Sequence, residues 1–174
     1  MKSKKIVVGI CGSVAAIRVP ELVRELKRKG IDVQCVMSES AKKILHPNVL
    51  EWASENDVVT AMTGKVEYIK SLGIGGDASL LLICPATSNT ISKIANGIDD
   101  TTVTTFATTA LGSRIPIVIV PAMHISMYKN PFVVENIKTL KKVGVKFIEP
   151  KIEENKAKVP SKEYIVNFVL KILK

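Results

Sequence analysis

Residues 6–16, IVVGICGSVAA, are an apolar run followed at once by a glycine and small side chains. The apolar part is typical of a buried β-strand, and the small residues after it are typical of a turn that enters a helix. Two more apolar runs, at 80–84 and 115–120, lead in the same way into PATSNT at 85–90 and PAMH at 121–124. In a parallel α/β sheet such turns leave the carboxyl ends of strands, where ligands bind. Three of them at one edge predict a site for a flat, phosphate-bearing ligand.

The rest of the chain alternates strand patterns with helical patterns. Further strands are expected at residues 32–37 and 145–149, with a short edge strand at 58–60. Helices are expected where apolar residues recur at helical spacing, at residues 19–26, 41–45, 49–53, 91–98, 131–140 and 164–173. This alternation predicts an α/β fold whose sheet is mainly parallel. We see no linker or repeat, so residues 1–174 are expected to form a single domain.

The chain carries 25 lysines and arginines against 16 aspartates and glutamates, a formal net charge of +9. No basic stripe alternates with aromatic residues, which argues against nucleic-acid binding. The excess positive charge suits an anionic small-molecule substrate. No apolar run approaches the roughly 20 residues that cross a bilayer, so no membrane segment is expected. The basic start of the chain leads into an apolar run too short for a signal peptide, and we expect a cytoplasmic protein.

The three cysteines are Cys11, Cys35 and Cys84. Their odd number and their spacing argue against a disulfide framework and against a metal site. All three lie in apolar strand patterns, where a free cysteine acts as a small hydrophobic residue. Cys11 and Cys84 adjoin the predicted ligand turns, which leaves a redox role open for them.

The turns after the first two strands favour a mononucleotide over a dinucleotide. Gly9 and Gly12 begin a G-x-G pattern, but the x-x-G that completes a dinucleotide fingerprint is missing, and there is no Walker loop. Amides at residues 12–14, near a helix N-terminus, can hold one phosphate. Ser38 and Ser40 add hydroxyls that suit a phosphate or a ribityl chain. FMN fits this pattern; the alternative is a tight turn with no ligand.

The third turn offers more polar groups than its helix needs. Thr87, Ser88 and Asn89 supply two hydroxyls and an amide at the start of a helix. These residue types also cap helices, but capping needs only one of them. Asn89 suits the edge of a flavin ring, which presents donors and acceptors side by side.

These segments together resemble the family of flavin-dependent decarboxylases that includes phosphopantothenoylcysteine decarboxylase. The similarity spans nearly the whole chain and rests on GSVAA at 12–16, the pair Ser38 and Ser40, PATSNT at 85–90 leading into KIANGIDD at 93–100, and PAMHISMY at 121–128. The resemblance implies a Rossmann-like three-layer fold with helices on both sides of the sheet. It also implies bound FMN at a subunit contact, in homotrimers or homododecamers built from trimers.

The resemblance also implies roles by position. The residues that would meet the FMN phosphate region are Gly12, Ser13, Val14, Ser38 and Ser40. Those that would line the flavin are Thr87, Ser88, Asn89, Thr90 and Ala122. The substrate-binding motif would supply Met123, His124 and Met127.

Three positions depart from the family pattern. Tyr68 stands where the family has a histidine, His124 stands where the motif has an asparagine, and the expected lid at residues 150–160 contains no cysteine. His124 and Tyr68 are the candidate catalytic residues. An unperturbed histidine titrates near 6.5 and can act as a base or bind a carboxylate, whereas tyrosine, near 10, is a poor base. The alternatives are a polar loop role for His124 and a packing role for Tyr68.

In the family reaction, the flavin oxidises the thiol end of a cysteine, the adjacent carboxylate leaves as carbon dioxide, and the hydride is then returned. Three functions therefore stay open for this chain. The first is an FMN-dependent decarboxylase, a carbon-carbon lyase of coenzyme A biosynthesis. The second is an FMN-dependent oxidoreductase or electron-transfer flavoprotein, which the replaced histidine favours. The third is a non-catalytic flavin-binding interaction protein.

Overall fold

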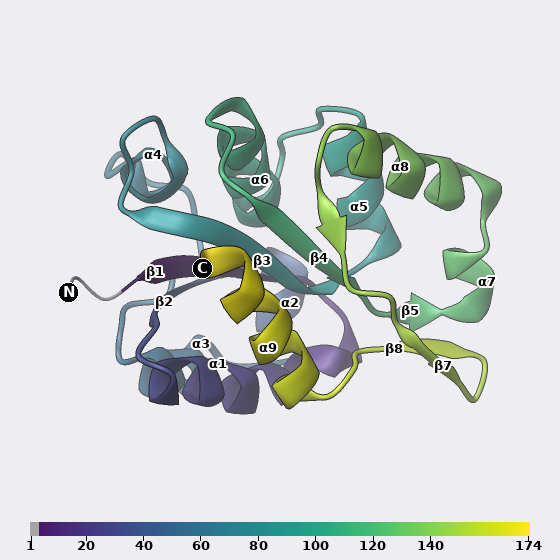
Figure 1. Ribbon diagram of the computed structural model, residues 1–174, viewed down its shortest axis with the longest axis horizontal. Coiled ribbons are helices and arrows are strands. Elements are labelled where there is room, and N and C mark those ends of the chain that lie inside the picture. Colours follow the sequence, from purple (N-terminus) through teal and green to yellow (C-terminus); the bar gives the residue numbers. More distant parts are fainter. Residues whose placement is uncertain (1–3) are drawn as a thin grey trace.

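The computed structural model describes residues 4–174 and contains a central parallel sheet (Figure 1). Its strand order is β2-β1-β3-β4-β6. The bounds are β1 Lys5–Ile10, β2 Asp32–Met37, β3 Ala78–Ala86, β4 Ile117–Pro121 and β6 Lys146–Phe147. The order reverses between β1 and β3, which makes the carboxyl ends of these two strands the switch point at which doubly wound folds bind ligands.

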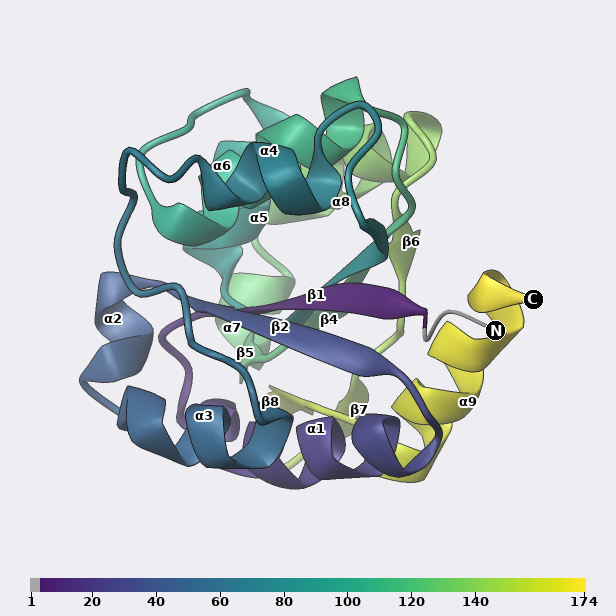
Figure 2. The ribbon, with the colours of Figure 1, turned by 90° about the vertical axis from the view of Figure 1, so that its left-hand side faces the viewer.

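Helices cover both faces of the sheet, as expected (Figure 2). One face packs against the 3-10 helix η1 (Val14–Arg18) and against α1 (Val19–Arg28), α3 (Pro47–Ser54) and α9 (Lys162–Leu173). The other packs against α4 (Glu67–Leu72), α5 (Ser88–Ala95), α6 (Thr102–Gly112) and α8 (Pro131–Lys142). The short helix α2 (Glu39–Lys42) follows β2. The chain therefore has the predicted three-layer α/β architecture.

Local sequence signals account for several of these elements. In α1, Val19, Leu22 and Leu26 are buried at helical spacing, and Pro20 falls in the first turn, where its missing N–H costs nothing. Asn130 caps α8 through a 2.9 Å bond from the backbone N–H of Phe132. Helices α4 and α6 were not predicted.

A second, small antiparallel sheet of order β5-β8-β7 lies beside the main one. It consists of β5 (Met123–His124), β7 (Lys151–Glu153) and β8 (Lys156–Lys158), and the helix α7 (Ile125–Tyr128) follows β5. Glu154 and Asn155 form the turn between β7 and β8 with φ of 49° and 58°. The segment expected to be a polar lid is thus a hairpin that pairs with the strand after β4.

Two strand predictions need correction. The strand expected at 145–149 is only two residues long, because β6 pairs with β4 at Lys146 and Phe147 alone. The expected edge strand at 58–60 is reduced to a single bridge between Val59 and Val36. Within residues 4–174 no helix is long and apolar enough to cross a membrane. The expectation about the basic start of the chain falls partly on residues 1–3, outside the described residues.

Candidate functional site

Backbone hydrogen bonds join the turns that leave the central strands. The N–H of Cys11, after β1, donates to the carbonyl oxygen of Pro85 at 3.2 Å. The N–H of Ala122, after β4, donates to the carbonyl oxygen of Ala86 at 2.9 Å. The turns that contain residues 12–14, 87–90 and 122–124 therefore start from one edge of the sheet, as predicted.

The turn after β2 joins the same edge. The N–H of Ser38 donates to the carbonyl oxygen of Ile10 at 3.0 Å. Ser40 lies against Gly12, whose position leaves no room for a side chain. The two serines singled out from the sequence are thus next to the glycine turn.

Three of the predicted ligand hydroxyls act as helix caps. Ser13, Ser38 and Thr87 accept bonds of 3.2–3.3 Å from backbone N–H groups at the starts of η1, α2 and α5. The capping hydroxyls of Ser13 and Ser38 keep their own protons for a further bond, whereas that of Thr87 donates to the Thr90 hydroxyl. Ser40 and Asn89 are exposed, and neither side chain hydrogen-bonds to another residue in 4–174. All hydrogen-bond donors and acceptors of these two side chains are therefore available to a ligand.

Ser88 and Thr90 lie deeper than expected for residues that line a flavin. Their exposed fractions are 9% and 6%. The Thr90 hydroxyl accepts a 3.2 Å bond from the hydroxyl of Thr87 and contacts the thiol of Cys11. Thr90 thus links the turn after β3 to the end of β1.

A cavity of about 470 Å³ opens between η1, β5 and the β7–β8 hairpin. The predicted site residues that line it are Ser13, Val14, Ala122, Met123 and His124. A second cavity of about 420 Å³ lies between η1, α1 and the start of α9, and it shares Ala15, Ile17, Arg18 and Val159 with the first. Met127, on α7, is exposed at 47% and lines neither.

His124 is the N-cap of α7. Its Nδ1 atom accepts a bond of 3.2 Å from the backbone N–H of Ser126 and lies 2.7 Å from the Ser126 hydroxyl. Because Nδ1 must offer a lone pair to that N–H, the neutral ring carries its proton on Nε2. His124 in this arrangement is a hydrogen-bond donor through Nε2.

Tyr68 lies away from His124 within one chain. It is half-buried on α4, where its ring packs edge-to-face on Phe106 with centroids 6.3 Å apart. It lines neither of the two cavities. Figure 1 shows α4 at one end of the sheet, and β5 and α7 at the other. The two candidate catalytic residues are therefore not brought together by the fold of a single chain.

The cysteines do not form a reactive site. Burial raises the pKa of Cys11 to about 11 and those of Cys35 and Cys84 to about 12. All three are thus protonated thiols near neutral pH, and a thiol reacts through its thiolate. The geometry gives no support to a redox role for Cys11 or Cys84.

Sequence reasoning missed the hairpin as a wall of the cavity. Glu154, Lys156 and Lys158 line it, together with Arg18 from η1. The available signal was two short strand patterns around Asn155, a residue that tolerates the positive φ of a two-residue turn.

Comparison with known proteins agrees with the family resemblance of the sequence. The model of the Flavoprotein family matches residues 1–174. The chain belongs to the Flavoprotein family. Within this family it is 56% identical to the coenzyme A biosynthesis bifunctional protein CoaBC of Thermococcus kodakarensis, over 98% of the chain and 42% of that protein. The chain thus spans about two fifths of the length of this relative.

Two other similar proteins match over most of their length. The probable phosphopantothenoylcysteine decarboxylase of Streptococcus mutans is 35% identical over 86% of the chain and 84% of that protein. The crystal structure of SpaF, described as an FMN-dependent cysteine decarboxylase, covers 98% of both chains with a TM-score of 0.83 and 27% identity. The family and the fold predicted from the sequence are confirmed.

Proposed function

We propose that this chain binds FMN at the carboxyl edge of its sheet and with it decarboxylates phosphopantothenoylcysteine. The observation that carries the proposal is the convergence of the turns after β1, β2, β3 and β4 at the point where the strand order reverses. The likeness to the Streptococcus protein and to SpaF supports the substrate class and the cofactor.

The groups at this edge fit a flavin mononucleotide. Helices η1, α2 and α5 all begin there, and the first N–H groups of a helix have no partner within it, which suits a phosphate. The residues that would hold the phosphate and ribityl parts are Gly12, Ser13, Val14, Ser38 and Ser40. Those that would meet the ring are Thr87, Ser88, Asn89, Thr90 and Ala122. Bound FMN would supply the oxidation of the thiol-bearing carbon and the return of a hydride.

His124 would bind the substrate carboxylate. The cap on α7 leaves its Nε2–H as a donor, and a carboxylate is the acceptor that such a donor prefers. Met123 and Met127 flank His124 in sequence and would contact the rest of the substrate. This arrangement favours a binding and orienting role for His124 over that of a base.

Tyr68 would act from a neighbouring copy of the chain. Within one chain α4 and β5 lie at opposite ends of the sheet, so a site that uses both Tyr68 and His124 needs two subunits. This supports a homo-oligomer, a homotrimer or a homododecamer, with the flavin at the subunit contact. We further infer that residues 1–174 fold as a single domain and that the protein works in the cytoplasm.

Turnover with His124 variants tests the function. Protein loaded with FMN is expected to release carbon dioxide from phosphopantothenoylcysteine. His124→Ala should lower kcat/KM by about 100-fold, and His124→Asn, which keeps a donor, should recover part of this loss. The flavin spectrum is the control for both variants. Equal activity in all three proteins would contradict the role of His124.

A flavin oxidoreductase is the second candidate, because Tyr68 replaces the family histidine. Reduction of the bound flavin by a nicotinamide, without release of carbon dioxide from phosphopantothenoylcysteine, would select it. A protein that cannot be loaded with FMN would contradict both candidates.

Mixed oligomers test the shared site. His124→Ala and Tyr68→Phe subunits are each expected to be nearly inactive alone. Co-expressed, they should form some contacts at which His124 and Tyr68 are both intact, and activity should return. Absence of recovery in a proven mixed oligomer would contradict the two-subunit site.

A further inference from the structure

Two cations that line the 470 Å³ cavity, Arg18 and Lys156, take part in no ion pair among the residues that the structure describes. The charged and titratable residues that line this cavity are Arg18, His124, Glu154, Lys156 and Lys158. Lys158 is neutralised locally, because its Nζ lies 2.7 Å from Glu154 and 3.6 Å from Glu153. Arg18 and Lys156 are exposed and form no ion pair within residues 4–174. The cavity therefore holds two cations outside any ion pair, and of these Lys156 lies near enough to the Glu154 carboxylate to help Lys158 lower its pKa.

These cations stand beside apolar walls. Arg18 ends η1, on the wall shared with the second cavity, and Lys156 lies opposite His124 in the pairing of β5 with β8. Val14 and Ile17 line the same cavity and are exposed at 72% and 59%. Such a cavity fits a ligand with a partly apolar body and an anionic end.

We propose that Arg18 and Lys156 form a subsite for a phosphate monoester, that of the substrate. This inference rests on the proposed function. A phosphate monoester carries about −1.5 to −2 charges at pH 7 and three acceptor oxygens. The Arg18 guanidinium can hold two of these oxygens at once, and the ammonium of Lys156 adds a mobile point charge. His124, to which we assign the substrate carboxylate, is held in place by the bond from the Ser126 N–H. The carboxylate and the phosphate would therefore have separate partners.

Calorimetry on the FMN-loaded protein tests the subsite with 4′-phosphopantothenate and pantothenate, which lack the reacting thiol. Wild-type protein should bind the phosphorylated compound at least tenfold more tightly. Arg18→Gln and Lys156→Gln should each remove about tenfold of that affinity and leave pantothenate binding unchanged within twofold. Lys151→Gln is the control for charge removal from the same hairpin outside the cavity, and it also breaks the ion pair of Lys151 with Glu153.

Three outcomes would overturn the subsite. These are equal binding of the two compounds by wild-type protein, an equal loss for both compounds in the variants, and a defect confined to the affinity for FMN relative to riboflavin. The last would assign the cations to the phosphate of the cofactor. A preference for phosphopantothenate without any release of carbon dioxide from phosphopantothenoylcysteine would support the subsite and contradict the proposed reaction.

Discussion

Gly12 lies so close to Ser40 that a Cβ atom at Gly12 would stand 2.4 Å from the Cβ atom of Ser40. The same position is 3.1 Å from the backbone carbonyl carbon of Ser40. Glycine is therefore required here by the neighbouring turn, and not by a positive φ. This contact joins the ends of β1 and β2, the two turns to which we assign the phosphate side of FMN.

We expect Gly12→Ala to lower the free energy of unfolding by about 1–3 kcal/mol, because the methyl group overfills the space beside Ser40. The turn must also shift, so affinity for FMN should fall. Adding Ser40→Gly should restore part of the stability, since it removes the atom nearest to the new methyl group. Denaturant unfolding of the three proteins measures this. Additive losses in the double variant would contradict the steric explanation.

The Tyr68→Phe variant should distinguish a packing role of the Tyr68 ring from a catalytic role of its hydroxyl. The ring that contacts Phe106 is kept, so stability should change by less than about 0.5 kcal/mol, while kcat should fall by about 100-fold if the hydroxyl acts in the site of a neighbouring copy. Tyr68→Ala should also destabilise the fold, by about 1–3 kcal/mol. Unchanged kcat in Tyr68→Phe would leave Tyr68 a packing residue only.

The β7–β8 hairpin should control substrate affinity. Ala157 is 2% exposed and pairs with Met123, so Ala157→Asp places a charge in the contact that holds the hairpin against the substrate motif. We expect KM to rise and proteolysis near residues 150–160 to accelerate. Ile152→Asp is the matched control, because Ile152 faces Ala157 in the same sheet but is 52% exposed. Similar effects of both changes would argue against hairpin docking.

Stability should fall steeply in alkali. The three thiols titrate near their ordinary value of 9.0 when unfolded, and burial raises the folded pKa to about 11 for Cys11 and about 12 for Cys35 and Cys84. Between pH 9 and these values the folded protein holds more protons, so stability declines as pH rises. Each thiol contributes roughly 1 kcal/mol per pH unit. Unfolding curves from pH 8 to 11 should show this slope, and Cys35→Ala should make it shallower.

The strands and the site turns could be predicted because their signals are local. Apolar runs bounded by small residues mark β1 and β3, and Asn130 with Pro131 marks the start of α8. The threonine-rich helix α6 was missed because threonine has a weak helix propensity, although Val103, Phe106, Ala107 and Ala110 recur in it at helical spacing. It forms because Phe106 is fully buried and Thr101 caps it reciprocally with Thr104.

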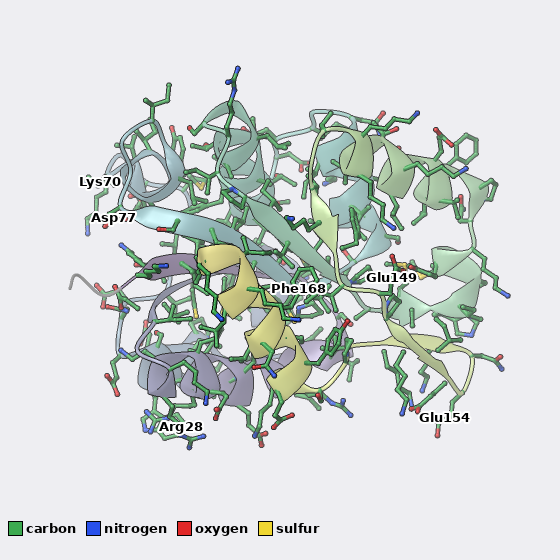
Figure 3. All side chains as sticks on the ribbon, in the orientation of Figure 1. Arg28, Lys70, Asp77, Glu149, Glu154 and Phe168 are labelled. Carbon is green, nitrogen blue, oxygen red and sulfur yellow. The ribbon has the colours of Figure 1, made fainter. Side chains whose placement is uncertain are left out.

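Contacts between segments far apart in the chain could not be predicted from the sequence. Neither the closeness of Gly12 to Ser40 nor the pairing of Met123 with Ala157 has a local signal. The ion pairs of the site could not be predicted from the sequence either. Glu154, at the tip of the hairpin in Figure 3, forms an ion pair with Lys158, whereas Lys156 forms none within residues 4–174. The excess positive charge of the chain, which suits an anionic substrate, could therefore not be assigned to particular side chains of the site.

A crystal structure of the protein soaked with FMN decides whether the turns at the carboxyl edge of the sheet bind the flavin. We expect the phosphate of FMN at residues 12–14 with Ser38 and Ser40, and its ring beside Asn89 and Ala122. Flavin bound at another face of the sheet, or crystals that stay colourless at saturating FMN, would contradict this expectation.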